Sequence, residues 1–435
     1  MRTLAVALAL SVCAAAATTN TTAVTFNKQV LPIMQKRCQD CHRPGEVAPM
    51  SLLTYQDARP WAKAIRQAVL TKKMPPWFAD PAYGHFSNDR TLSQAEIDTI
   101  ISWVDGGAKE GDPKDAPAPR TFVEGWNIGK PDLVLQMPNA FHVPATGVIE
   151  YQYVILPTNL KEDKWILAAE VRPNRSVMHH VITSIREPGS KWMADMQPGV
   201  VFVPPKGSRA GQLDGGLSGY VPGQALPPAG SPRRATLLKA GSDIVFQLHY
   251  TPNGTPVDDQ TKIGIIFAKE PPNERLMGGN SAAYRFAIPP GDSNFEVDGT
   301  STVAYDSYLY SMMPHAHLRG KSFEYRIVRP DGTSETVLKV PHYDFHWQLT
   351  YYLEKPIFLP KGTKVEVTAH FDNSANNVNN PDPTKEIHWG EQTFEEMMMG
   401  YFSVVVDPKD APADNGRRRQ ASVQSELPAR LASAQ

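Results

Sequence analysis

Two histidines separated by one residue, His315 and His317, give the chain its clearest potential for chemistry. They follow the apolar run 307–311, which is typical of a strand. On an extended chain, residues two apart point to the same face, so both imidazoles can bind one metal ion. The methionines at 397–399 could add a thioether, and two imidazoles with one thioether form a soft site suited to Cu(I). The alternatives are a solvated histidine pair and methionines that pack in a core.

Three further histidines could form a second site. His179 and His180 are adjacent, so on a regular strand they would face opposite ways. Binding one metal with both therefore requires a local irregularity; otherwise they are an ordinary polar pair at a sheet end. His249 lies in the segment 243–250, on the face opposite to its apolar residues, so it can face a site while they face a core.

A Cys-x-x-Cys-His sequence formed by Cys38, Cys41 and His42 predicts covalent haem c. The two thiols bond to the haem and the histidine binds the iron. The sixth ligand is predicted to be Met74, in a proline-stiffened loop after a helix, with Met50 as the competitor. An iron with His/Met ligation suits electron transfer. The alternative reading of the two cysteines is a redox or zinc Cys-x-x-Cys motif.

The start of the chain predicts export. Residues 1–18 have the basic start, apolar run and small residues of a signal peptide, and no later stretch is apolar enough to span a membrane. We expect a periplasmic or secreted protein; Cys13 could instead carry a lipid. After cleavage only Cys38 and Cys41 remain, so no disulfide framework is expected.

The chain is long enough for several domains, with 435 residues and a formal charge of −1. This charge gives no reason to expect nucleic acid or an anionic membrane as a partner. Residues 24–112 predict short helices on both sides of the Cys-x-x-Cys-His motif. Ser93 and Glu96 form a capping box, and Gly106 is a stop signal. This segment resembles a small class I cytochrome c.

From residue 131 onward short alternating runs replace helical periodicity, after a linker at 113–130 rich in proline, glycine and charge. The expected strands are 151–156, 165–171, 243–250, 263–267, 323–328 and 364–372. Such spacing predicts β-sandwiches. The fold class expected is therefore a small all-α cytochrome c domain followed by two all-β, jelly-roll-like sandwiches. We place these sandwiches at 131–275 and 276–408, followed by a disordered tail at 409–435.

In order along the chain, residues 131–408 carry a His-His pair, a His-Tyr strand end, a His-x-His and a Thr-x-x-Glu-Met sequence. Together these motifs resemble the copper type II, ascorbate-dependent monooxygenases, the family of peptidylglycine α-hydroxylating monooxygenase and dopamine β-monooxygenase. The resemblance implies two sandwiches with one copper each, facing across a solvent-filled cleft. It assigns His179, His180 and His249 to the copper that supplies electrons. It assigns His315, His317 and Met397 to the copper that binds O₂ and hydroxylates substrate.

Two departures limit what the resemblance carries over. An arginine that clamps a peptide carboxylate two residues before the His-x-His is replaced here by Met313, and the disulfides of the animal enzymes are missing. Tyr401 matches a substrate-contacting tyrosine, although a strand tyrosine is more often structural. His342 and His346 could support a site or be ordinary surface residues.

The function expected is an exported monooxygenase that hydroxylates a C–H bond of a small substrate with O₂. It would use two coppers and one haem c, with an external electron donor to the haem and with ascorbate or another reductant. The main alternative is a non-catalytic haem/copper electron-transfer or copper-binding protein, and a third is a haem–copper sensor.

Overall fold

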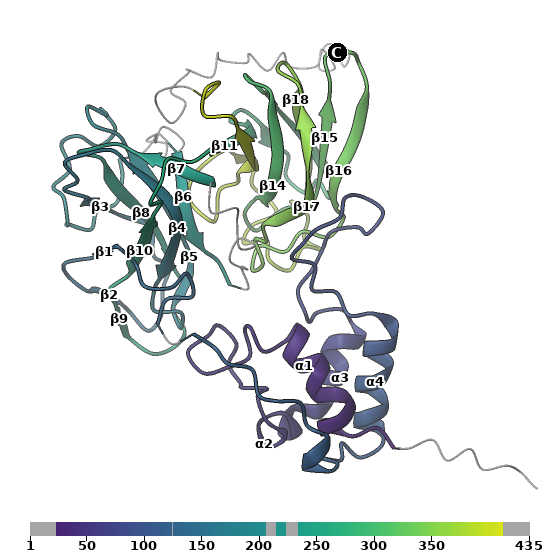
Figure 1. Ribbon diagram of the computed structural model, residues 1–435. Helices are drawn as coiled ribbons and strands as arrows, with labels where there is room; N and C mark the ends of the chain where they lie inside the picture. The colour runs from purple at the N-terminus through teal and green to yellow at the C-terminus, as the bar shows by residue number, and fades with distance from the viewer. Residues whose placement is uncertain (1–22, 124, 206–214, 223–233, 412–435) are drawn as a thin grey trace, which may run out of the picture.

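The structure is a computed structural model that describes residues 23–123, 125–205, 215–222 and 234–411. The predicted signal peptide and most of the predicted tail lie outside the described residues. A helical unit lies below two β-rich halves, which stand side by side (Figure 1). None of its helices, within the part of the chain that is described, is long and apolar enough to cross a membrane.

The helical unit is built from short helices around one small core. Its elements are η1 Phe26–Val30, α1 Leu31–Arg37, α2 Tyr55–Ala58, η2 Arg59–Trp61, α3 Ala62–Leu70, α4 Gln94–Asp105 and, in the predicted linker, η3 Pro113–Asp115. Phe26, Met34, Ile100 and Trp103 are fully buried in the core. The predicted capping box of Ser93 and Glu96 begins α4, and Gly106 caps its end. Helices this short do not by themselves identify a cytochrome c, so that assignment stays a prediction.

The rest of the described chain is mostly β-sheet, as the alternating runs predict. The first half contains β1 Leu133–Gln136, β2 Phe141–Val143, β3 Gln152–Pro157, β4 Lys164–Arg172, β5 Met178–Arg186, β6 Gly215–Tyr220, β7 Arg234–Leu238, β8 Asp243–Tyr250, β9 Val257–Asp259 and β10 Lys262–Phe267. The second half contains β11 Glu274–Ala283, β12 Ala287–Ile288, β13 Phe295–Thr302, β14 Ser307–His315, β15 Gly320–Val328, β16 Ser334–Val340, β17 Tyr351–Leu359, β18 Lys364–Phe371, β19 Ile387–His388 and β20 Met398–Val406.

One sheet runs through both halves. Its order is β1-β10-β4-β7-β11-β20-β14-β17, and the parallel pair β7–β11 joins the half that ends at β10 to the half that begins at β11. A four-stranded sheet, β3-β8-β5-β6, packs on the first half, and another, β13-β18-β15-β16, packs on the second. Each half is thus a two-layer sandwich around its own core. The predicted division at 275/276 falls within the first residues of β11.

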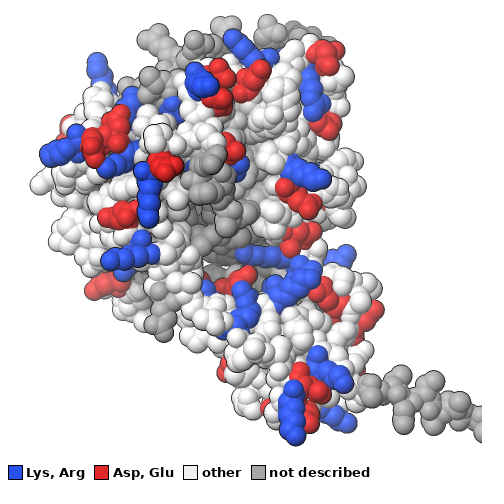
Figure 2. All heavy atoms as spheres, in the orientation of Figure 1, with Lys and Arg blue, Asp and Glu red and all other residues white. Residues whose placement is uncertain are grey.

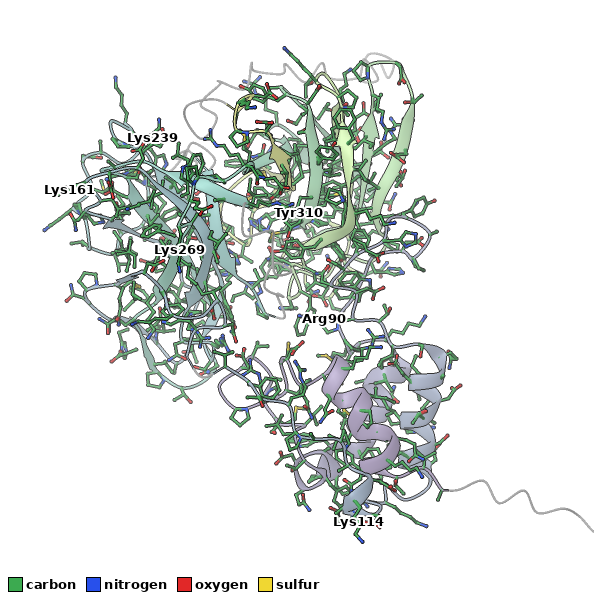
Figure 3. The ribbon with its side chains drawn as sticks, viewed as in Figure 1. Arg90, Lys114, Lys161, Lys239, Lys269 and Tyr310 are labelled. Carbon is green, nitrogen blue, oxygen red and sulfur yellow. The ribbon has the colours of Figure 1, made fainter. Side chains whose placement is uncertain are left out.

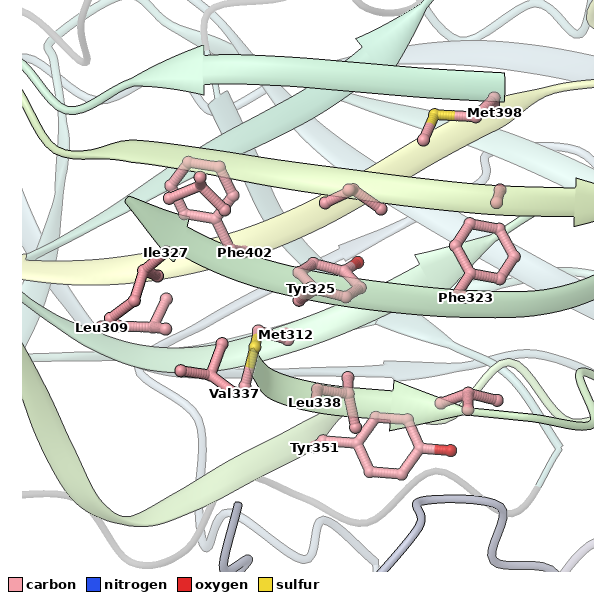
Figure 4. Close-up of a cluster of buried hydrophobic side chains, with 14 of the residues drawn as sticks. Leu309, Met312, Phe323, Tyr325, Ile327, Val337, Leu338, Tyr351, Met398 and Phe402 are labelled. Atoms are coloured by element: carbon pink, nitrogen blue, oxygen red, sulfur yellow. The ribbon is translucent and has the colours of Figure 1, made fainter. Parts of the chain in front are cut away.

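The second core explains which methionines are structural. Met312 and Met398 are fully buried among Leu309, Tyr325 and Phe402, between β14 and β20 on one side and β15 on the other (Figure 4). Side chains of neighbouring strand residues point to opposite faces. Residues adjacent to Met398 therefore project from the other face of the sheet, away from this core.

The helical unit contacts both sandwiches. The backbone of residues 85–88 runs along the edge strand β17: Ser87 N donates to Tyr352 O at 2.9 Å, and Glu354 N donates to His85 O at 2.8 Å. Trp77 and Phe86 pack against Tyr351 of the same strand. This contact covers backbone groups that an edge strand would otherwise leave open. On the surface visible in Figure 2, acidic and basic side chains are interspersed, in keeping with the small net charge.

Candidate metal centre

His179, His180 and His249 form the first cluster, and they lie on paired strands β5 and β8. The pairing of β5 with β8 shifts between Met178 and His180, which is the local irregularity that one site for two adjacent histidines requires. Beyond the shift, His180 lies opposite His249. The shift lets His179 and His180 both turn toward the strand that carries His249.

The donor nitrogens of this cluster converge. One ligand atom from each of the three histidines lies within 4.8 Å of the others. The Nδ1 atom of His180 is 3.2 Å from Nδ1 of His179 and 3.4 Å from Nδ1 of His249. The His249 Nε2 atom lies 3.2 Å from the hydroxyl of Thr393. When Nε2 carries the proton and donates it to this hydroxyl, Nδ1 is the lone-pair donor that could bind a metal.

His315 and His317 form the second cluster, at the end of β14. Their ring centroids are 5.4 Å apart. His315 Nδ1 lies 2.5 Å from the side-chain oxygen of Gln348, and His317 Nδ1 lies 3.3 Å from the carbonyl oxygen of Glu395. Both contacts require a proton on Nδ1, so each Nε2 is left as the lone-pair donor. The Nε2 atom of His317 is buried and has no hydrogen-bond partner among the described residues.

The strand register separates the three candidate methionines. β14 pairs with β20 so that His315 lies directly opposite Met399, and directly opposed residues share a face. The pairing ends at this pair of residues, and Met397 lies just before β20, so the register does not place it. Met398 points the other way, into the core of the second sandwich. Met399 therefore shares the histidine face and Met398 does not, while Met397 remains the ligand that the Thr-x-x-Glu-Met motif predicts.

The side chain of Glu396 ties His317 to Met397. Its carboxylate accepts backbone N–H groups from His317, from Met397 at 2.9 Å and from Arg319 at 3.0 Å. Glu396 is fully buried, and burial raises its pKa to about 7 although the three N–H donors act to lower it. Arg319 is also buried and donates to Asn373 and to the carbonyl of Phe394. This network fixes the segment before β20 against the end of β14.

Burial keeps the histidines neutral. It lowers the pKa of His179 and of His315 to about 4, and it lowers the pKa values of His180, His249 and His317 well below 6.5. Neighbouring imidazoles lower the pKa values of four of them further. Neutral imidazole is the form that binds metals. The buried Nε2 atoms of His179 and His180 also lack hydrogen-bond partners among the described residues.

The two clusters lie against each other, which corrects the expected solvent-filled cleft. The rings of His180 and His315 have centroids 6.3 Å apart. Phe345 of the second sandwich stacks on His179 at 4.5 Å and lies 6.3 Å from His317. Tyr151 of the first sandwich packs on His249 at 4.6 Å. The cleft is closed because these aromatic side chains and the segment around Thr393 fill the space between the sandwiches.

A second contact holds the same interface together. Tyr153 of β3 donates its hydroxyl to Glu391 at 3.1 Å and accepts a hydrogen bond from Gln247. The backbone N–H of Tyr151 lies 3.4 Å from the side-chain oxygen of Gln392. The segment 391–396 of the second sandwich therefore contacts the first sandwich. The same segment contains Glu396 and ends directly before Met397.

Several of these residues are missed by sequence reasoning. Phe345, Gln348 and Tyr151 carry no motif, and their roles follow only from the packing of the two sandwiches. Thr393 and Glu396 are part of the Thr-x-x-Glu-Met sequence, so that motif contains a signal for them. His346 lies 5.8 Å from the ring of His179, next to the first cluster, and is exposed.

Tyr401 and Met313 are opposite each other in the pairing of β14 with β20. The Tyr401 ring centroid is 6.1 Å from that of His315, on the histidine face. Met313 occupies the place where a carboxylate clamp would need a cation, and it is half-buried. The substrate role predicted for Tyr401 stays a prediction.

The Cys-x-x-Cys-His motif follows α1 directly. Cys41 N and His42 N both donate to the carbonyl of Cys38, at 3.2 and 3.0 Å, and the two cysteines are free thiols. His42 Nδ1 lies 3.2 Å from the carbonyl oxygen of Met50. Burial raises the pKa of the Cys38 thiol to about 12 and also raises that of Cys41. A thiol that stays protonated is a poor redox nucleophile, which disfavours the alternative of a reactive dithiol.

The two candidate sixth ligands lie in different surroundings. Met50 packs against the core of the helical unit, as Cys38 does. Met74 is half-buried, in the loop that leads to the residues packed on β17. The choice between them stays open, and Met74 remains the prediction.

Residues 276–405 match the family model of the copper type II ascorbate-dependent monooxygenase, C-terminal domain. That family uses copper and ascorbate, and the match supports a copper-dependent monooxygenase, which is an oxidoreductase. The matched segment is the second sandwich and includes His315, His317 and Met397. It includes neither the first cluster nor the helical unit.

No curated protein matches the chain. Two of the similar solved structures are from infectious bursal disease virus. The Gt strain structure is 10% identical and has a TM-score of 0.19, over 69% of this chain and 76% of that chain. The Gx strain structure is 8% identical with a TM-score of 0.18, over 64% and 73%. Scores this low carry no argument about this protein.

Proposed function

We propose that the protein is an exported copper-dependent monooxygenase that hydroxylates a C–H bond of a small substrate with O₂. The observation that carries the proposal is the convergence of two buried groups of neutral donors, from both sandwiches, on one interface. One group offers three imidazole Nδ1 atoms. The other offers two imidazole Nε2 atoms with a thioether on the same face.

The donors fit copper. Imidazole binds both copper states, and a thioether favours Cu(I). The buried Nε2 atom of His317 has no hydrogen-bond partner among the described residues, which costs free energy, and a metal bound there would satisfy it. When bound, copper at the two sites would supply the two electrons and the activation of O₂ that hydroxylation needs. In this proposal His179, His180 and His249 hold one ion, and His315, His317 and Met397 hold the other.

The protein's own residues would position and shield these sites. Thr393, Gln348 and the carbonyl of Glu395 orient the imidazoles through their second nitrogens. Phe345 and Tyr151 exclude water from the space between the clusters. Tyr401 lies beside His315, where a substrate contact is proposed. Entry of a substrate then requires the two sandwiches to separate locally.

We further propose that Cys38, Cys41 and His42 carry haem c, with Met74 as the sixth ligand. The turn of the motif supports this, because Cys41 N and His42 N both donate to the Cys38 carbonyl. The Met50 carbonyl oxygen accepts from His42 Nδ1, which leaves Nε2 for iron. The haem would receive electrons from an external donor and pass them to the first cluster. Ascorbate or another small reductant could supplement it.

Oxygen consumption tests the oxygenase. Copper-loaded protein, reduced and mixed with candidate substrates, should consume O₂ only with substrate, and His315→Ala should abolish that uptake. His142→Ala is the matched control, because His142 is exposed, pairs with Asp258 and belongs to neither cluster. Failure of every reduced sample to take up O₂ would favour the alternative, a non-catalytic haem/copper electron-transfer or copper-binding protein. The buried, closed interface is the observation that keeps this alternative in view.

Stopped-flow spectroscopy tests the relay. After O₂ is added, the reduced haem should be oxidised faster in copper-loaded protein than in copper-free protein. An identical rate without copper would mean that the haem does not feed the copper sites.

A further inference from the structure

The connection between β16 and β17, residues 341–350, holds the end of β14 that carries the second cluster. The hydroxyl of Tyr343 donates to the carbonyl oxygen of Ala316 at 2.8 Å and accepts from the Ala316 N–H at 3.1 Å. The side-chain oxygen of Gln348 lies 2.5 Å from Nδ1 of His315. Ala316 separates the two histidines of this cluster, so a shift of the connection would move their donor atoms.

The helical unit bonds to the chain at both ends of this connection. At its start, the N–H of Asp80 donates to the carbonyl oxygen of Lys339 in β16 at 2.8 Å. At its end, the side-chain amide of Asn88 donates to the carbonyl oxygen of Thr350 at 2.7 Å. The side-chain oxygen of Asn88 accepts from the N–H of Tyr352 at 3.1 Å. One asparagine thus bonds to the last residue of the connection and to the second residue of β17.

Close packing accompanies these hydrogen bonds. The ring centroids of Trp77 and Phe86 lie 4.9 and 5.5 Å from that of Tyr351, the first residue of β17. A Cβ added at Gly84 would lie 2.5 Å from the carbonyl oxygen of Val337 in β16, so only glycine allows this approach. The helical unit therefore fits against the two strands that the connection joins.

The segment that carries Asn88 continues to the Cys-x-x-Cys-His motif. Arg90 follows two residues later, and Figure 3 labels it where the helical unit meets the sandwiches. Its Nη1 atom lies 3.9 Å from the sulfur of Cys41. The guanidinium of Arg37, the last residue of α1, donates to the carbonyl oxygen of Asp89 at 3.3 Å. Asn88 is therefore anchored to the motif and to α1 on one side and to the connection on the other.

We propose that Asn88 is a positioning residue for the copper site of His315 and His317, and that docking of the helical unit completes this site. Asn88 fixes the end of the connection, and Gln348 of the connection orients the His315 ring. Only Leu349, which is buried in the second core, separates Gln348 from the residue to which the Asn88 amide donates. The inference rests on the proposed function and gives the helical unit a role besides carrying electrons.

Cu(I) competition titration of full-length protein matured with haem tests this role. His249→Ala is the background, because it removes a donor of the first cluster and leaves the second cluster intact. In this background Gln348→Leu should weaken Cu(I) binding about 10–100-fold, as loss of a group that orients a ligand generally does. Asn88→Ala should weaken it several-fold. Ser87→Ala is the matched control, because its hydroxyl bonds to the Tyr352 carbonyl at 3.3 Å, in β17 and not in the connection.

A double variant determines whether Asn88 acts through Gln348. If it does, Asn88→Ala should weaken Cu(I) binding little further once Gln348→Leu is present, because the effects of coupled residues do not add. The same substitution is also made in a His315→Ala background, which leaves the first cluster intact. Copper binding there should change little, whereas a general loosening of the protein would weaken binding at both clusters.

Backbone hydrogen exchange of metal-free protein checks the docking step. Asn88→Ala should increase exchange at 343–352, because the Tyr352 N–H loses its acceptor and the connection loses an anchor, without change along β5. Unchanged exchange there, unchanged Cu(I) binding at the second cluster, or additive effects of Asn88→Ala and Gln348→Leu would each overturn the positioning role while the proposed function stands. If the His249→Ala protein itself binds no Cu(I), both fall.

Discussion

Buried histidines that stay neutral at pH 7 determine how the metal-free protein responds to acid. The pKa of His179 and of His315 falls from 6.5 to about 4 on folding, chiefly because burial disfavours the charged ring. Between these values the unfolded chain binds protons that the folded chain does not. The free energy of unfolding must therefore fall as the pH is lowered from 6.5 toward 4.

We expect copper-free protein to lose about 1.4 kcal/mol per pH unit for each such histidine in this range. Chemical denaturation at pH 7 and pH 5 measures the difference. His315→Asn should make the dependence shallower, whereas replacing the exposed His142 should leave it unchanged. An equal pH dependence in wild type and His315→Asn would show that the His315 ring is not buried and neutral in the folded protein.

The methionines give a second prediction at this scale, because register separates their roles. Met398→Ala should destabilise the protein by about 2–5 kcal/mol, since it opens a cavity in the second core. Met397→Ala should leave stability less affected but weaken Cu(I) binding at the His315 and His317 site. Thermal unfolding and Cu(I) competition titrations measure the two effects. If Met399→Ala weakens Cu(I) binding and Met397→Ala does not, the copper ligand is Met399 and not Met397.

At the scale of elements, Glu396 links the end of β14 to the start of β20. Glu396→Gln replaces one carboxylate oxygen by an NH₂ group, which donates and cannot accept. At least one of the three buried backbone N–H groups that now donate to Glu396 therefore loses its acceptor. An unsatisfied buried group costs about 1–3 kcal/mol. We expect that loss of unfolding free energy together with weaker copper binding at His315 and His317.

Glu366→Gln is the control for this variant, because Glu366 forms an ion pair with the exposed Arg326. Its effect on the free energy of unfolding should stay within about 0.5 kcal/mol. Denaturant titration of both variants, with copper content measured alongside, separates a local role of Glu396 from a general effect of removing charge. A Glu396→Gln variant as stable as the control would contradict the role assigned to the carboxylate.

The elements themselves were largely predictable from sequence. The segment 243–250 alternates, and the structure makes it β8 with His249 on the face opposite the core, as predicted. The adjacent pair at 179–180 required an irregularity, and the register of β5 shifts there. The sheet that joins both halves was not predictable, because the parallel pairing of β7 with β11 depends on contacts between segments with no shared pattern.

The site was predictable in part for the same reason. Sequence motifs predict the donor residues, because only a few side-chain types can bind copper. Phe345 and Tyr151 are ordinary aromatics in the sequence, and their position follows from how the sandwiches meet. The closed interface was missed because the expectation of a cleft came from resemblance and not from these residues.

At the scale of the whole molecule, the contact between the sandwiches shields the first cluster. Phe345→Ala should expose His179, because Phe345 stacks on that ring. In copper-free protein, histidine acylation followed by mass spectrometry should label His179 faster in this variant than in wild type. Phe358→Ala is the control, since Phe358 is 45% exposed and lies on β17. Equal labelling of His179 in all three proteins would mean that the sandwiches already open freely.

The most direct test of the account is the metal and haem content of each chain, on protein matured with haem in an exporting host. The account predicts one haem and two coppers, with one copper lost in His315→Ala and the other lost in His249→Ala. One haem with no more than one copper would contradict the two-site mechanism and leave an electron-transfer or binding protein.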